Sequence, residues 1–75
     1  MAIAANPVML PPVRLKGKYY TVFYSNLFGY FKVTCNGEIF VELKGLEAKP
    51  YLQMLGQLGA ELTVDRLIEW RYNQA

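Results

Sequence analysis

The chain contains no histidine and only one cysteine, Cys35, and these two shortages exclude several kinds of chemistry. One cysteine cannot form a disulfide within the chain. One thiol and scattered carboxylates do not make a zinc ligand set, so we expect no metal. Histidine is the usual general base and a usual member of nucleophilic triads, so its absence argues against catalysis. We therefore predict a protein that is not an enzyme and that uses no cofactor.

Long apolar runs are also missing. The first ten residues are mostly apolar, but they include no basic segment, and Pro7, Pro11 and Pro12 interrupt the region. A secretory signal begins with a basic segment, and a helix needs roughly 20 apolar residues to span a bilayer. A single cysteine also suits a reducing compartment. Together these features predict a cytoplasmic protein.

The length of 75 residues predicts one domain. Domains this small have little interior and depend on good packing or on association with another chain. The hydrophobic fraction of 53% is high for such a chain, which suggests that some apolar surface is buried against another copy or a partner. The net charge of +2 is too small to identify a nucleic-acid-binding protein.

Residues 1–12 are predicted to form an extended, Pro-containing N-terminal arm, because Pro11 and Pro12 exclude a helix there. The arm is either a loose tail or a segment that packs against a partner. Residues 13–75 are predicted to form a single small α+β domain, with no repeats and no further boundary.

Three strands are predicted at residues 19–25, 30–35 and 38–43, which are rich in aromatic and β-branched residues. Residues 26–29 break the first run, and Asn36 with Gly37 is a strong hairpin signal. This order predicts a three-stranded antiparallel β-meander. Residues 13–18 can extend the first strand, with Gly17 as a bulge.

The register of the second hairpin follows from burial. A three-residue loop at 35–37 pairs Phe31 with Val41 and gives one wholly apolar face, whereas a two-residue turn at 36–37 pairs Phe31 with Glu42. Burial favours the register with one apolar face, so we predict the three-residue loop. The predicted core residues on the three strands are Tyr20, Val22, Tyr24, Phe31, Val33, Ile39, Val41 and Leu43.

Two C-terminal α-helices are predicted to pack on one face of the meander. Pro50 is tolerated only in a first turn, so the first helix begins near residue 47 or 48, and Gly59 caps its end. Thr63 is predicted to cap the second helix, with Asp65 in its first turn. The apolar sides of the two helices comprise Ala48, Tyr51, Leu52, Met54, Leu55 and Leu58, and Val64, Leu67, Ile68 and Tyr72.

Four aromatic residues are predicted on the other face of the sheet: Tyr19, Phe23, Tyr30 and Phe40. Three explanations remain open. The helices could cover this face instead, the face could bind a second copy or a partner protein, or its aromatic rings could stack on nucleic-acid bases. In the third case the phosphate contacts would be Arg14, Lys16, Lys18 and Lys32. Glu38 and Glu42 on the same face oppose that reading, since they repel phosphates.

The second helix contributes Trp70, which lies off its apolar side near Arg66, a combination frequent at binding hot spots. It could equally cover the edge of the core. We therefore expect a non-catalytic protein-interaction module of the small regulator or inhibitor type. It is expected to self-associate and to bind a partner protein through Tyr19, Phe23, Tyr30 and Phe40, or through Arg66 and Trp70. The alternative is a nucleic-acid-binding protein that uses the sheet aromatics with the basic stretch of residues 14–18.

Overall fold

A computed structural model describes residues 7–74, without the side chains of Tyr72 and Gln74. Residues 1–6 of the predicted arm and the predicted core position Tyr72 lie outside this description. The strands are β1 (Val8–Met9), β2 (Val13–Leu15), β3 (Lys18–Ser25), β4 (Tyr30–Cys35) and β5 (Glu38–Lys44). A 3₁₀ turn (Gly45–Glu47) leads to α1 (Lys49–Leu58) and α2 (Ala60–Gln74).

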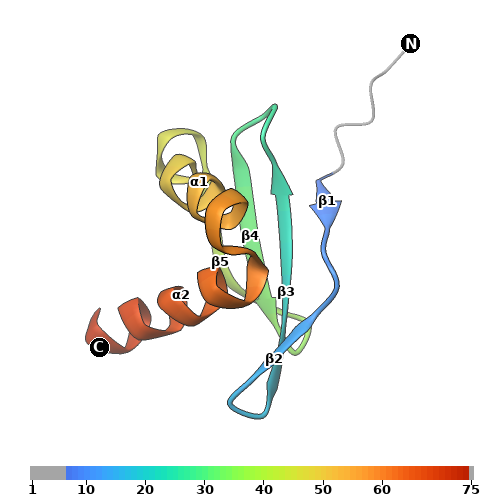
Figure 1. Cartoon of the computed structure of the whole chain (residues 1–75), viewed down its shortest axis with the longest axis vertical. Helices are drawn as coiled ribbons and strands as arrows, with labels where there is room; N and C mark the ends of the chain where they lie inside the picture. The colour runs from blue at the N-terminus through green and yellow to red at the C-terminus, as the bar shows by residue number, and fades with distance from the viewer. Residues whose placement is uncertain (1–6, 75) are drawn as a thin grey trace.

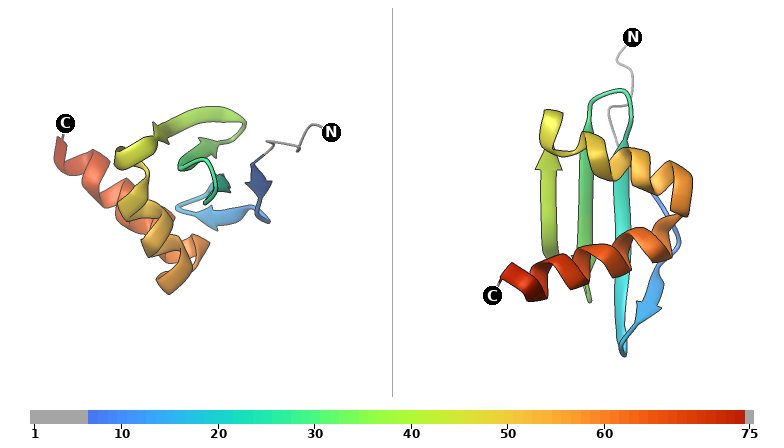
Figure 2. Two further views of the ribbon diagram at one scale, coloured as in Figure 1. Left: turned by 90° about the horizontal axis from the view of Figure 1, so that it is seen from above. Right: turned by 60° about the vertical axis from the view of Figure 1, so that its left-hand side comes forward.

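The strands form one antiparallel sheet in which β3, β4 and β5 follow each other as a meander. The short strands β1 and β2 both pair with β3 along its other edge. Both helices lie across the same side of this sheet, as the right-hand view of Figure 2 shows (Figures 1 and 2). The predicted α+β class, a meander followed by two helices on one face, is confirmed.

The β4–β5 hairpin differs from the predicted one. Its turn has two residues, Asn36 and Gly37, with φ of 51° and 88°. Positive φ at both positions is what a type I′ turn requires. Cys35 therefore pairs with Glu38, and the predicted three-residue loop is wrong.

A β-bulge restores the apolar register two residues later. Thr34 pairs with Ile39 but Val33 pairs with Val41, so Phe40 is the extra residue, and Phe31 lies opposite Leu43 rather than the predicted Val41. The bulge shifts the alternation by one residue. Ile39 is consequently 63% exposed, in contrast to its predicted core position, whereas Val41 and Leu43 pack against the core as predicted.

Residues 13–18 do not extend β3 as a single strand. Leu15 pairs with Lys18, and Lys16 and Gly17 form a tight turn with φ of 52° and 77°. A second two-residue turn of the I′ kind thus reverses the chain, and the predicted bulge at Gly17 is wrong. At its other end β3 turns into β4 as predicted, with Ser25 opposite Tyr30.

The two helices are joined by one residue, Gly59. Its φ of 87° ends α1 at the predicted position, and its N–H donates to the carbonyl of Leu55 over 3.0 Å. Because α2 begins at once with Ala60, Thr63 lies inside the helix and is not its N-cap. The Thr63 side chain is instead fully buried and donates its hydroxyl to the carbonyl of Gly59 over 2.7 Å.

The core lies between the helices and one side of the sheet. Phe31 and Val33 of the central strand β4 are fully buried, and the Phe31 ring stacks on Tyr51 of α1 with centroids 5.6 Å apart. The other buried apolar residues are Tyr20, Val22, Ala48, Leu55, Val64, Leu67 and Ile68. Within residues 7–74 no helix combines the length and the apolar character that crossing a bilayer requires.

Candidate partner-binding surfaces

The side of the sheet away from the helices forms the first candidate site, which we name the open face. Residues directly opposite each other on paired strands share a face. The observed register therefore places one set of side chains on the open face: Met9, Arg14, Tyr19, Thr21, Phe23, Ser25, Tyr30, Lys32, Thr34, Ile39, Glu42 and Lys44. Among the described residues both helices lie on the opposite side, so the first explanation considered for the aromatic side chains, burial beneath the helices, is wrong.

Two cations of the open face lie over two of its aromatic rings. The guanidinium carbon of Arg14 is 5.7 Å from the ring centroid of Tyr19, and the Lys32 ammonium is 4.6 Å from that of Phe23. Each is a cross-strand pair. Cation–π attraction holds a charge beside each ring, so the open face presents aromatic and basic groups together.

Among the described residues, Glu42 is the only carboxylate that the strand register places on the open face, and it accepts a hydrogen bond. The Tyr30 hydroxyl donates to Oε2 of Glu42 over 2.6 Å. This bond, with burial and the negative charge of Glu42 adding to it, raises the pKa of Tyr30 from 10.0 to about 12. The bond occupies one carboxylate oxygen with a neutral donor and leaves the negative charge of Glu42 in place.

We expect Tyr30 to titrate above an ordinary tyrosine, which an ultraviolet absorbance titration of phenolate would show. In Glu42→Gln the pKa of Tyr30 should fall back toward its ordinary value of 10.0, because the carboxylate acceptor and its charge are gone. Because the pKa of Tyr30 is higher in the folded state, its protonated hydroxyl contributes to the stability of the fold. This contribution is fully present below pH 10.0 and is lost as the pH rises through about 12. Tyr30→Phe removes one titrating group, and a missing step near pH 10.0 instead of near 12 would contradict this assignment.

Phe40 does not belong to the open face, in contrast to the prediction. The bulge turns its ring to the helix side, where it meets Tyr20 edge-on with centroids 5.6 Å apart. The Arg71 guanidinium lies 5.0 Å from the Phe40 ring, and Nη1 of Arg71 donates to the Phe40 carbonyl over 2.7 Å. Phe40 is therefore part of the packing between β5 and α2.

The observed register also changes the charge of the open face. Glu38 pairs with Cys35, whose partner on β3 is the buried Tyr20, so the register places Glu38 on the helix side. Lys44, which sequence reasoning missed, lies opposite Tyr30 and joins the open face. Of the predicted phosphate contacts, Arg14 and Lys32 lie on the open face, while Lys16 and Lys18 lie at the β2–β3 turn.

The predicted residues Arg66 and Trp70 form a separate surface on α2, where both are exposed. Trp70 is 48% exposed and forms one wall of a hollow of about 260 Å³. The other lining residues are Val41, Leu43, Glu47, Tyr51 and Leu67. The structure thus brings Tyr19, Phe23 and Tyr30 together but keeps them apart from Trp70.

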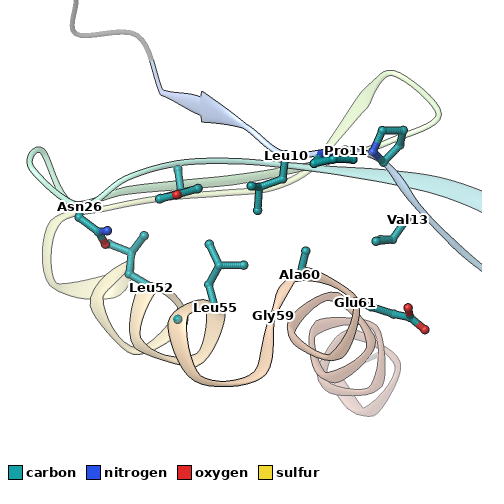
Figure 3. A pocket seen from close by; sticks show the side chains of 12 residues that line it. Leu10, Pro11, Val13, Asn26, Leu52, Leu55, Gly59, Ala60 and Glu61 are labelled. Atoms are coloured by element: carbon teal, nitrogen blue, oxygen red, sulfur yellow. The ribbon is translucent and has the colours of Figure 1, made fainter.

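A third feature, absent from the sequence-based prediction, is a hollow of about 570 Å³ between the helices and the β1–β2 edge of the sheet. We name it the elbow hollow, because it lies at the junction of α1 and α2 (Figure 3). Its lining residues are Leu10, Pro11, Pro12, Val13, Tyr24, Asn26, Leu52, Leu55, Gly56, Gly59, Ala60 and Glu61. These positions come from stretches that are far apart in the chain.

Groups that could support chemistry are sparse. In the described part of the chain no three His, Cys, Asp or Glu side chains lie close enough to hold a metal ion. Cys35 is half-buried and lines a small hollow with Lys18, Tyr20 and Phe40. No protein-family model, curated protein or solved structure matches the chain.

Proposed function

We propose that the protein is a non-catalytic protein-interaction module that binds a partner protein through the open face. One observation carries this proposal: the helices cover one side of the sheet, and the other side presents Tyr19, Phe23, Tyr30 and Met9 together. Tyr19 and Met9 are 53% and 64% exposed. Exposed apolar groups gathered on one surface, with polar groups around them, are typical of binding sites.

The composition of the open face suits a protein partner. Tyrosine and phenylalanine provide large contact areas with few rotatable bonds, so ordering them on binding costs little entropy. The hydroxyls of Thr21 and Thr34, which face each other on β3 and β4, provide neutral hydrogen-bonding groups between the rings. Such a surface is consistent with a small regulator or inhibitor that acts by occupying its target.

Phe23→Ser is the variant that tests this proposal. We expect it to keep the fold and to weaken partner binding about tenfold or more, since aromatic anchors dominate binding energy. Cross-linking in extracts of the source cells, with quantitative mass spectrometry, would nominate a partner. Calorimetric titration of the purified pair would then measure the loss of affinity.

Leu62→Ser provides a matched control, because Leu62 is 51% exposed and lies on α2, away from the open face. This change should leave the affinity unaltered, and circular dichroism should show both variants folded. A purified partner that binds wild type and Phe23→Ser equally well would refute the open face as the binding site.

Single-stranded nucleic acid is a second candidate for the same surface, and the observed register favours it. The observed register places Glu38 on the helix side and Lys44 on the open face, so among the described residues Arg14, Lys32 and Lys44 share the open face with one carboxylate, Glu42. Five of the eight Lys and Arg residues but only two of the six Asp and Glu residues lie in residues 7–44. A basic groove with aromatic side chains is the usual platform for single strands.

Oligonucleotide titration in the same experiment separates the two candidates. If nucleic acid is the partner, fluorescence anisotropy should show binding that weakens steeply with added salt, because bound phosphates release counterions. Phe23→Ser and Lys32→Gln should each reduce it. Absent or salt-independent binding would remove this candidate and leave the protein partner.

A further inference from the structure

One of the residues that line the elbow hollow, Gly56, is a glycine that the fold does not require. Gly56 lies inside α1, where glycine weakens a helix relative to alanine. Its φ is not positive, and a Cβ atom placed on it would have no neighbouring atom within 4 Å. Neither backbone conformation nor internal packing therefore requires glycine here, and Gly56 is one of the residues that line the elbow hollow.

The hollow is apolar inside and acidic at its rim. Leu10, Leu52 and Leu55 project into it from the two layers, as Figure 3 shows. Gly56 and Gly59 also line it and add no side chain to the helical wall. Glu61, in the first turn of α2, is the one charged side chain among its lining residues. Such a site fits a large apolar side chain that has a cation close by.

This chain exposes such a group at the opposite end of α2. Trp70 is half exposed, and Arg66, one turn earlier on the same helix, is also exposed. In the right-hand view of Figure 2 the end of α2 extends past β5 on one side of the molecule, and the helical elbow lies on the other. The two features therefore lie toward opposite ends of α2, and one chain cannot bring them together.

We propose that Trp70 of one copy docks into the elbow hollow of a second copy, with Arg66 beside the second copy's Glu61. The C-terminal end of one α2 then meets the N-terminal end of the next, an arrangement that also places opposite ends of the helix dipoles together. The contact joins two different surfaces at opposite ends of α2, and when repeated head to tail it continues from copy to copy or closes into a ring. The open face stays free, and this inference does not depend on the proposed function.

Light scattering over a dilution series tests the proposal. One anchored side chain makes a weak contact, so the mass of the wild type should rise with concentration between about 10 µM and 1 mM. Trp70→Ala removes the inserted group, and Gly56→Leu fills the hollow while favouring the helix. Each variant should remain monomeric over this range.

Mixing the two variants gives the sharper result. A Gly56→Leu chain still has Trp70, and a Trp70→Ala chain still has an open hollow, so an equal mixture should form a dimer and stop there. The Trp70 fluorescence of the Gly56→Leu chain should shift to the blue on mixing, because the indole leaves water. A two-fold dimer with two reciprocal Trp70 contacts would also recover one of them on mixing, but its wild type would stop at the mass of a dimer, whereas a head-to-tail contact lets the wild type grow past it.

Charge reversal supplies an independent arm, because Glu61 and Arg66 are both exposed and neither change should disturb the fold. Glu61→Arg and Arg66→Glu should each reduce association, since each variant alone brings two like charges together at the contact. An equal mixture of the two variants should restore association, because every contact between unlike chains again pairs a cation with an anion. The proposal is overturned if the single variants keep the wild-type mass, or if folded Trp70→Ala and Gly56→Leu chains stay monomeric when mixed.

Discussion

Replacing Phe31 by alanine is expected to unfold most of the protein at room temperature. Phe31 is fully buried in the central strand β4, and its ring stacks on Tyr51 of α1. Truncating a buried phenylalanine costs about 3–5 kcal/mol, because apolar contacts are lost and a cavity remains. A domain this small has a free energy of unfolding of similar size. Urea denaturation followed by circular dichroism would measure the loss.

Ile39→Ala is the informative control for this change. The predicted strand alternation, which has no bulge, places both Phe31 and Ile39 in the core. The observed bulge instead leaves Ile39 63% exposed. Its replacement should change the free energy of unfolding by no more than about 0.5 kcal/mol. A large loss at Ile39 would mean that the chain uses the three-residue loop after all.

Leu67→Ala is expected to give the second large loss, about 2–5 kcal/mol. Leu67 is 1% exposed, between α2 and the rest of the core. The same replacement five residues earlier, Leu62→Ala, removes the same atoms from a side chain that is 51% exposed. It should cost about 0.5 kcal/mol or less, so the pair isolates burial from helix propensity.

Urea midpoints of these two leucine variants also test where α2 begins. A helix that starts at Ala60 buries Thr63, Val64, Leu67 and Ile68 on one side and leaves Leu62 in solvent. Equal losses for Leu62→Ala and Leu67→Ala would contradict this orientation of the helix.

Local patterns predicted the three main strands, the cap at Gly59 and most of the core. They succeeded because alternation on β3 and β4 is regular and because Pro50 and Gly59 have strong positional preferences in helices. Ile39 and Phe40 exchanged places because the bulge depends on contacts distant in sequence. Arg71, 31 residues away, donates to the Phe40 carbonyl, and the Phe40 and Tyr20 rings pack in a T-shaped arrangement.

Other differences have local causes. β1 has two residues and is too short to show any alternation. The turn at Lys16 and Gly17 was missed because lysine rarely adopts positive φ, unlike the asparagine of the second hairpin. Thr63 is a residue type that often caps helices, but here its hydroxyl donates a hydrogen bond to the Gly59 carbonyl from inside the first turn of α2.

The candidate surfaces were predicted unevenly for the same reason. Tyr19, Phe23 and Tyr30 could be placed together because cross-strand pairing is a short-range property of a meander. Lys44 was missed because the third strand was predicted to end at residue 43, and the elbow hollow depends on the docking of the helices on the sheet. The one sequence signal for the hollow was Gly56, a glycine in the interior of an otherwise regular helix.

The contact between Arg71 and the Phe40 carbonyl also bears on how the chain is made. Among the described residues β5 has a neighbouring strand on one side only, and an unprotected edge strand readily pairs with other chains. A chain emerging from a ribosome completes β5 well before Arg71 appears. Until the last turns of α2 dock, the Phe40 carbonyl lacks this donor, and their arrival makes that one group of the edge strand unavailable to another chain.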